Sequence, residues 1–421
     1  MNKKNYVAVA TLAFAMLTSC AGQKEAKSTS GIDLANMDTT VSAGTDFFRY
    51  ACGGWNDAHP LTAEYSRYGT FDELFENSQT QLRELIEGLA AQKNNQAGSA
   101  AQKIGDLYNM AMDSVTLNKQ GAEPVKAMLD KIAGMKNKNE IVPMMTEMAH
   151  IGIGTYFRSY VYADPKNSSV NILQMGQGGI NLGEKEYYLD TDSITQNIRE
   201  QYKLYIGKLF QLAGFSEADA QQKVADVMEI ETAIAKVSCS ATELRDPEAN
   251  YHKMSFDELK KTIAGIDWDA YVKGLGIQAP AELNVEQVEP IQEVARLMNT
   301  LPLSKHVSYL EYNLLDAAAS CLSDDFVAAR FDFYGKVLSG RQVNQPRWKR
   351  AVNSVNGMLG ELVGEMYVEK YFPAAAKERM VKLVKNLQTA LGERIDAQEW
   401  MSDSTKAVAA EKLAAFHVKV G

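Results

Sequence analysis

The chain has 421 residues, of which 46% are hydrophobic and 23% are charged. These proportions are typical of a folded globular protein, and the length allows two or three ordinary domains or one large helical body. The formal net charge of −9 argues against a nucleic-acid partner, because nucleic-acid binding favours a basic face.

The first twenty residues have the pattern of a bacterial export signal. Lys3 and Lys4 precede an apolar run from Tyr6 to Leu17, which is too short to cross a membrane as a helix. The run ends in Leu17-Thr18-Ser19-Cys20, which resembles a lipobox, whose cysteine is lipidated and becomes the new N-terminus. We therefore expect a signal peptide at 1–19 and a lipidated tether at 20–39. The protein would then be a membrane-anchored lipoprotein of the bacterial cell envelope, and the alternative is an ordinary signal peptide with an incidental cysteine.

Three further cysteines, Cys52, Cys239 and Cys321, would lie in an oxidising compartment. Three is an odd number, so at least one of them has no partner within this chain. The sequence does not fix their pairing, and three buried free thiols are the simpler interpretation.

Helical periodicity dominates the body of the chain. Phe71 to Leu89 carries apolar residues at three- and four-residue spacing, which predicts a long amphipathic helix. Further helices are expected at about 194–213, 216–238, 255–264, 283–299 and 304–321. Two short alternating runs, Tyr156 to Tyr162 and Val170 to Met175, flank a Pro/Asn/Ser turn and predict a β-hairpin. The expected fold class is mainly α, a large multi-helix lobe with one small β-hairpin.

The histidines offer no zinc site of the helical type. Such a site needs two imidazole rings one turn apart on the same helix face, as in His-Glu-x-x-His. This motif is absent, and no two of the five histidines lie three to five residues apart. We therefore assign no catalytic residue and no metal ligand in this chain.

Several motifs nevertheless resemble one enzyme family along most of the chain. They are, in order, Ala51-Cys52-Gly53-Gly54-Trp55, Ser66-Arg67-Tyr68-Gly69, Gly179 to Leu182 with Tyr187-Tyr188-Leu189, Arg245-Asp246-Pro247 with Tyr251, Arg347-Trp348-Lys349-Arg350, and Gly364 to Phe372. Together they resemble the neprilysin and endothelin-converting-enzyme family of zinc metalloendopeptidases. The likeness covers residues 40–421 and only the N-terminal portion of that family. Relatives continue into the His-Glu-x-x-His segment and the other zinc ligands.

The resemblance implies a function for the whole enzyme and a role for one residue here. The full-length enzyme would use Zn to cleave oligopeptides, and this chain, without the C-terminal catalytic domain, would be inactive alone. Residues 40–90 would pack on that absent catalytic lobe. Arg67 matches the family arginine that pairs with the free C-terminal carboxylate of short peptides, a task that suits a planar guanidinium. The alternative is that Arg67 forms a surface ion pair with Glu64 or Glu73.

Two other functions remain open from the sequence. The chain could be a non-catalytic lipoprotein that binds peptides. It could also be the scaffold lobe of a split enzyme, whose catalytic half is encoded separately.

Overall fold

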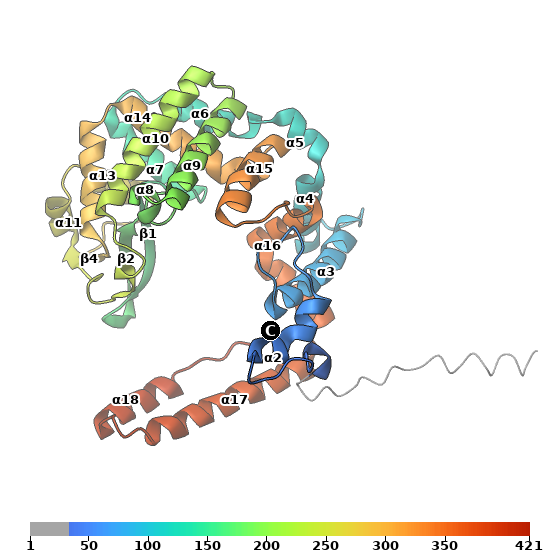
Figure 1. Cartoon of the computed structure of the whole chain (residues 1–421). Helices are drawn as coiled ribbons and strands as arrows, with labels where there is room; N and C mark the ends of the chain where they lie inside the picture. Colours follow the sequence, from blue (N-terminus) through green and yellow to red (C-terminus); the bar gives the residue numbers. More distant parts are fainter. Residues whose placement is uncertain (1–32) are drawn as a thin grey trace, which may run out of the picture. The chain divides into compact units, whose positions relative to one another are not determined.

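The structure is a computed structural model that describes residues 33–421, and Cys20 and the expected signal peptide lie outside this range. The described chain divides between Thr62 and Ala63 into two compact units, residues 33–62 and Ala63–Gly421. Figure 1 shows that helices make up most of the described chain. The predicted fold class, mainly α, is confirmed.

The first unit contains a short 3₁₀ helix, η1 (Leu34–Asn36), and the helix α2 (Phe47–Ala58). Arg49 holds them together, because its guanidinium pairs with Asp38 at 2.9 Å and with Asp57 at 2.6 Å. A Cβ on Gly54 would collide with the carbonyl oxygen of Ala35. The Gly-Gly pair of the Ala51–Trp55 motif therefore serves the close packing of α2 on η1.

The second unit is a helical body with one small sheet. Its helices are α3 (Thr70–Ala90), α4 (Ala100–Met112), α5 (Ser114–Gln120), α6 (Glu123–Ala133), η2 (Lys138–Glu140), α7 (Ile141–His150), α8 (Glu186–Leu189), α9 (Ser193–Leu212), α10 (Glu217–Val237), η3 (Glu243–Arg245), α11 (Phe256–Thr262), α12 (Trp268–Gly274), α13 (Val288–Thr300), α14 (Leu303–Ala318), η4 (Ala319–Cys321), α15 (Asp324–Arg330), η5 (Phe331–Leu338), α16 (Arg347–Tyr371), α17 (Ala374–Asp396) and α18 (Asp403–Ala414). Its strands are β1 (Phe157–Asp164), β2 (Asn167–Gln177), β3 (Lys253–Ser255) and β4 (Glu282–Val285).

The predicted hairpin is present as β1 and β2, which pair antiparallel. It belongs to a mixed four-stranded sheet of order β1-β2-β4-β3, in which β4 runs parallel to β2. The buried end of β2 lies in the centre of this sheet, with Leu173 opposite Leu283. The sequence did not indicate β3 and β4, and residues 283–285 were assigned to a helix that starts only at Val288.

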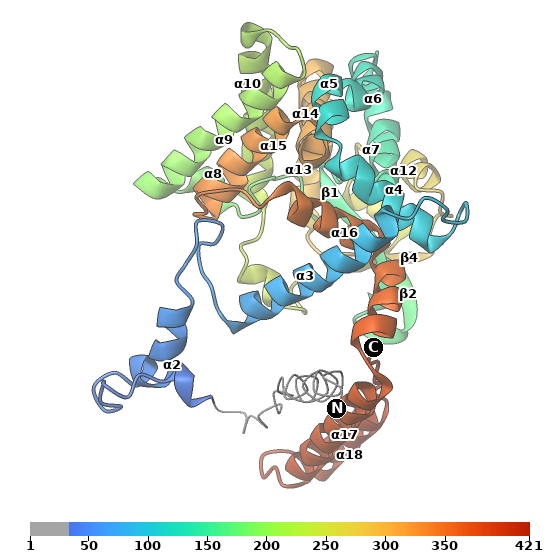
Figure 2. The same cartoon turned by 90° about the vertical axis from the view of Figure 1, so that its right-hand side faces the viewer.

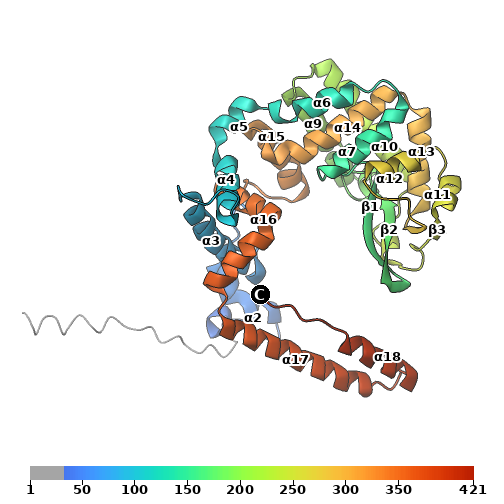
Figure 3. The same ribbon diagram turned by 180° about the vertical axis from the view of Figure 1, so that it is seen from behind.

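The larger hydrophobic core lies between this sheet and the helices that surround it. Trp268, Tyr202, Tyr309, Tyr312 and Phe326 are among its largest fully buried side chains. Figure 3 shows the sheet beside α12, α13 and α10 from behind.

A smaller core joins α3, α4 and α16, which lie side by side in Figures 1 and 2. Ile86 from α3, Ile104 from α4 and Val352 from α16 are completely buried there. The predicted amphipathic helix Phe71–Leu89 is therefore confirmed as α3, and it packs on a helix nearly 270 residues later in the sequence.

Two further observations concern surfaces. The cysteines Cys52, Cys239 and Cys321 are all free thiols, but none is fully buried as expected, because Cys52 and Cys239 are half-buried and Cys321 is exposed. Between residues 33 and 421, no helix is both long enough and apolar enough to cross a membrane.

Candidate functional site

Two of the sequence motifs, residues 66–69 and 347–350, meet at one place in the second unit. The loop that carries Arg67 is held by the segment before α16, because the amides of Gln342 and Val343 donate to the carbonyl oxygen of Ala63 at 2.9 and 3.1 Å. The loop ends where α3 begins, and there the side chain of Asp72 accepts a hydrogen bond from the amide of Gly69 at 2.9 Å. The site is therefore built from segments about 280 residues apart.

Lys349 is the centre of this arrangement. It is only 7% exposed, and its Nζ lies 3.0 Å from Glu64 and 2.8 Å from Glu76. Burial alone would lower the pKa of Lys349, but the hydrogen bonds that its ammonium donates to Glu76 and Glu64 raise it above its usual value. The amine thus stays charged and joins the loop, α3 and α16.

Aromatic side chains complete the support of the loop. Tyr65 donates a hydrogen bond to Glu76, and burial followed by this bond raises the pKa of Tyr65 well above its usual value. The rings of Tyr65 and Tyr68 meet edge to face at a centroid distance of 5.1 Å. The guanidinium carbon of Arg83, in α3, lies 4.5 Å from the ring centroid of Trp348, in α16. Most of the motif residues at this place are therefore structural.

Arg67 is the exception, because it is exposed. Within the described part of the chain, its side chain forms no ion pair or hydrogen bond, and Glu64 is engaged by Lys349 instead. A guanidinium that is open to solvent on a supported loop can pair with a carboxylate from another molecule. Its role in substrate binding stays a prediction.

The first turns of α3 add an apolar surface just after Arg67 in the sequence. Phe71, Leu74 and Phe75 are 88%, 56% and 46% exposed, although they are large hydrophobic residues. Neighbouring exposed apolar side chains of this size are typical of a surface that is covered by a ligand or another domain.

Sequence reasoning missed a buried acid, Glu231 of α10, which is completely inaccessible to solvent. Tyr188 and Tyr202 donate hydrogen bonds to it at 2.7 and 2.9 Å, and Asn181 donates one at 2.7 Å. Burial raises the pKa of Glu231 to about 7, although these hydrogen bonds act in the opposite direction. The motif from Gly179 to Leu189 thus has a structural use, since it supplies Asn181 and Tyr188 to this acid.

The segment Arg245 to Tyr251 is also structural. Tyr251 donates to the carboxylate of Asp164 at 2.9 Å, and Asp246 accepts from the amides of Glu248 and Ala249 at 3.0 Å. These bonds fix the connection between α10 and β3 against the end of β1.

The described residues do not fit a zinc ion. From residue 33 to the end, no group of three or more His, Cys, Asp or Glu side chains could hold a metal. His306 is buried, accepts a hydrogen bond from Tyr156 at 2.7 Å and donates to the carbonyl oxygen of Leu297, and burial lowers its pKa to about 4. His150 and His252 contact the carbonyl oxygens of Gly274 and Val285.

Comparisons with known proteins identify relatives over nearly the whole chain. A family model described as peptidase family M13 matches residues 43–421. Endothelin-converting enzyme 1 of Rattus norvegicus is 29% identical over 407 residues, which cover 92% of this chain and 52% of the relative. Membrane metallo-endopeptidase-like 1 of Homo sapiens is 26% identical, with the same coverage.

The comparison with solved structures agrees with the comparison of sequences. The crystal structure of the Mycobacterium tuberculosis zinc metalloprotease Zmp1 in complex with an inhibitor matches with a TM-score of 0.84 and 31% identity. The match covers 91% of this chain and 58% of that one. The chain therefore spans about half the length of the curated relatives it matches.

Proposed function

The chain belongs to peptidase family M13, and from this premise we propose that it is the N-terminal portion of a zinc-dependent metalloendopeptidase that cleaves oligopeptides. The match of residues 43–421 to the family supports this proposal, together with the likeness to a zinc metalloprotease structure at a TM-score of 0.84. The chain spans about half the length of the relative from Rattus norvegicus.

In this proposal, the zinc ligands and the catalytic residues lie in the C-terminal half of the enzyme. Zinc in such enzymes polarises the scissile carbonyl and lowers the pKa of a bound water toward neutrality. The described residues offer no ligand set for zinc, so we assign no catalytic step to them and propose that the chain alone is inactive.

We propose that Arg67 contributes substrate binding by pairing with the terminal carboxylate of a peptide. The single observation that carries this role is the exposed guanidinium of Arg67 on a loop held by the buried Lys349. Glu64, on the same loop, is already paired with Lys349. The exposed residues Phe71, Leu74 and Phe75 support the expectation that residues 40–90 face the catalytic lobe.

The N-terminal sequence supports a proposal for the location. Because Leu17-Thr18-Ser19-Cys20 resembles a lipobox, we propose that Cys20 is lipidated and anchors the protein in the bacterial cell envelope.

A non-catalytic lipoprotein that binds peptides is the second candidate. It is favoured by the exposed guanidinium of Arg67 in a chain whose described residues form no zinc site. The scaffold lobe of a split enzyme is the third. The coding sequence downstream separates the three candidates. A continuous reading frame that encodes His-Glu-x-x-His supports the enzyme, and a separate catalytic gene supports the split form. The absence of both supports the binder.

The proposed role of Arg67 is tested in the enzyme that contains this chain together with its catalytic half. Arg67→Ala should raise the Michaelis constant for peptides with a free C-terminus about ten- to a hundredfold, since hydrogen bonds to a charged group contribute roughly 1.5–3 kcal/mol. Turnover should change less, because a remote anchor binds ground and transition states nearly alike.

Amidated versions of the same peptides should be almost unaffected by the substitution. Arg67→Lys should rescue only partly, because lysine lacks the planar fork. The matched control is Arg296→Ala on α13, which removes an exposed arginine that pairs with Glu293. An equal loss on free and amidated peptides would mean that Arg67 is structural.

A further inference from the structure

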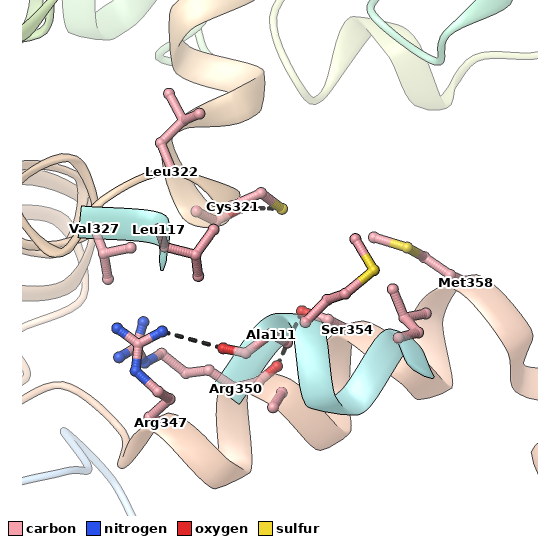
Figure 4. Close-up of a pocket in the computed structure, with 13 residues that line it drawn as sticks. Ala111, Leu117, Cys321, Leu322, Val327, Arg347, Arg350, Ser354 and Met358 are labelled. Atoms are coloured by element: carbon pink, nitrogen blue, oxygen red, sulfur yellow. Dashed lines mark hydrogen bonds between the residues drawn. The ribbon is translucent and has the colours of Figure 1, made fainter. Parts of the chain in front are cut away.

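A separate pocket lies in the second unit where α4, α5, α15 and α16 meet. Its volume is about 190 Å³. Figure 4 shows this pocket and the residues that line it. None of these residues belongs to the loop of Arg67, so the pocket is distinct from the site described above.

The walls of the pocket are mainly apolar. The side chains that supply this surface are Leu107, Met110, Leu117, Leu322, Val327 and Met358. Met110 and Met358 are 67% and 61% exposed, which places them at the rim. An apolar cavity of roughly 150 Å³ is large enough for a benzene molecule, so this pocket has room for one ring or one branched aliphatic group.

Two arginines from the first turn of α16 also line the pocket. Arg347 pairs with Asp324 and donates to the carbonyl oxygen of Ala111 at 3.1 Å. In Figure 4, Arg350 reaches toward the same side of the pocket as Arg347. Its Nε donates to the carbonyl oxygen of Gln345 at 3.2 Å.

The two arginines, Arg347 and Arg350, carry two positive charges but share a single paired carboxylate. In the part of the chain that the structure covers, Asp324 is the only carboxylate that forms an ion pair with either guanidinium; it pairs with Arg347, and Arg350 forms no ion pair. Burial, and then the nearby charge of Arg347, lower the pKa of Arg350, while the attraction of Asp324, which already pairs with Arg347, acts in the opposite direction. A half-buried cation beside a like charge is unfavourable, and an anion bound next to it would relieve that cost.

We propose that this pocket binds a small carboxylate that carries one apolar group, with the carboxylate paired to Arg350 and the apolar group held between Met110, Leu322 and Met358. The apolar walls select the group and the unbalanced guanidinium selects the charge, as is usual for small-molecule sites. The same chemistry could come from a free small acid or from the C-terminal residue of a peptide.

The test uses the whole chain labelled with ¹³C at its methionine methyl groups, and 4-methylpentanoate as the probe. The acid should shift the signals of Met110 and Met358 in a saturable way, with a Kd on the order of 1 mM for so few atoms. The signals of the core residues Met148 and Met298 should not move. 4-Methylpentanamide, which has the same shape without the charge, should bind about tenfold more weakly or worse.

Arg350→Gln should weaken binding of the acid by a similar factor, and Arg350→Lys should weaken it less. Arg296→Gln, at an exposed arginine on α13, should have no effect. The proposal is overturned if the acid leaves Met110 and Met358 unshifted, or if the acid and the amide bind equally. The comparison of acid and amide uses the unmodified chain, so it decides the matter even if Arg350→Gln fails to fold.

N-acetyl-alanyl-leucine distinguishes the two sources of the carboxylate. Tighter binding than 4-methylpentanoate, with the same two methyl shifts, would identify a peptide end as the ligand. Weaker binding would identify a free acid. Either result is compatible with the proposed chemistry.

Discussion

Lys349 allows a sharp test of how the Arg67 loop is held. Its side chain is 9% exposed, and the side chains of Glu64 and Glu76 are each 26% exposed. Removing one partner of a buried ion pair costs about 3–5 kcal/mol. Because both glutamates keep some contact with water, we expect Lys349→Met to destabilise the loop by roughly 2–3 kcal/mol. Methionine keeps the apolar stem, so the loss reports the charge.

Hydrogen exchange at the amides of Gln342 and Val343 is the assay, because both donate to Ala63 at the start of the loop. A loss of about 2 kcal/mol would speed their exchange about thirtyfold. The matched control is Lys370→Met, since Lys370 is 51% exposed and lies 3.9 Å from Glu84. It should change stability by less than about 1 kcal/mol. If Lys349→Met accelerates exchange no more than Lys370→Met, the ion pairs do not hold the loop.

The charge of Lys349 also sets the direction of the pH dependence. Its pKa is raised in the folded chain, so the charged form is stabilised by folding. This contribution is complete below the pKa of a free lysine and is lost as pH rises through the higher folded value.

Two further predictions concern Glu231 and Cys20. Because burial raises the pKa of Glu231 to about 7, its contribution to stability should be complete below the pKa of a free glutamate and be lost as pH rises through about 7. Thermal unfolding between pH 5 and pH 8 should show that stability falls as pH rises, and Glu231→Gln should remove this pH dependence. An unchanged pH dependence in the variant would contradict the assignment. Cys20→Ala should release the protein from the membrane fraction or leave it attached through an uncleaved leader, and wild-type protein found only in the soluble periplasm would exclude lipidation.

The helices and the hairpin could be predicted because their signals are local. The expected helices at 194–213 and 216–238 agree with α9 and α10 to within one residue at each end. The strands β3 and β4 have only three and four residues; β4 forms on the edge that β2 offers, and β3 pairs in turn with β4. Such short strands carry no periodicity of their own, so the sequence could not show them.

In the candidate site, too, local motifs could be predicted from the sequence and contacts between distant segments could not. The identity of Arg67 and its motif could be read from the sequence, but its lack of an ion pair depends on Lys349 binding Glu64. That contact joins residues 285 positions apart. Glu231 was missed for the same reason, because its partners Asn181, Tyr188 and Tyr202 come from other elements.

We propose that this chain is the N-terminal portion of a zinc peptidase, that Arg67 binds substrate, and that the zinc ligands belong to another part of the enzyme. The most direct test is the metal content and peptidase activity of the purified chain after chelation and addition of zinc. We predict no stoichiometric zinc and no cleavage of oligopeptides, because a catalytic zinc site needs about three protein ligands. One tightly bound zinc per chain, together with peptide hydrolysis, would contradict the claim.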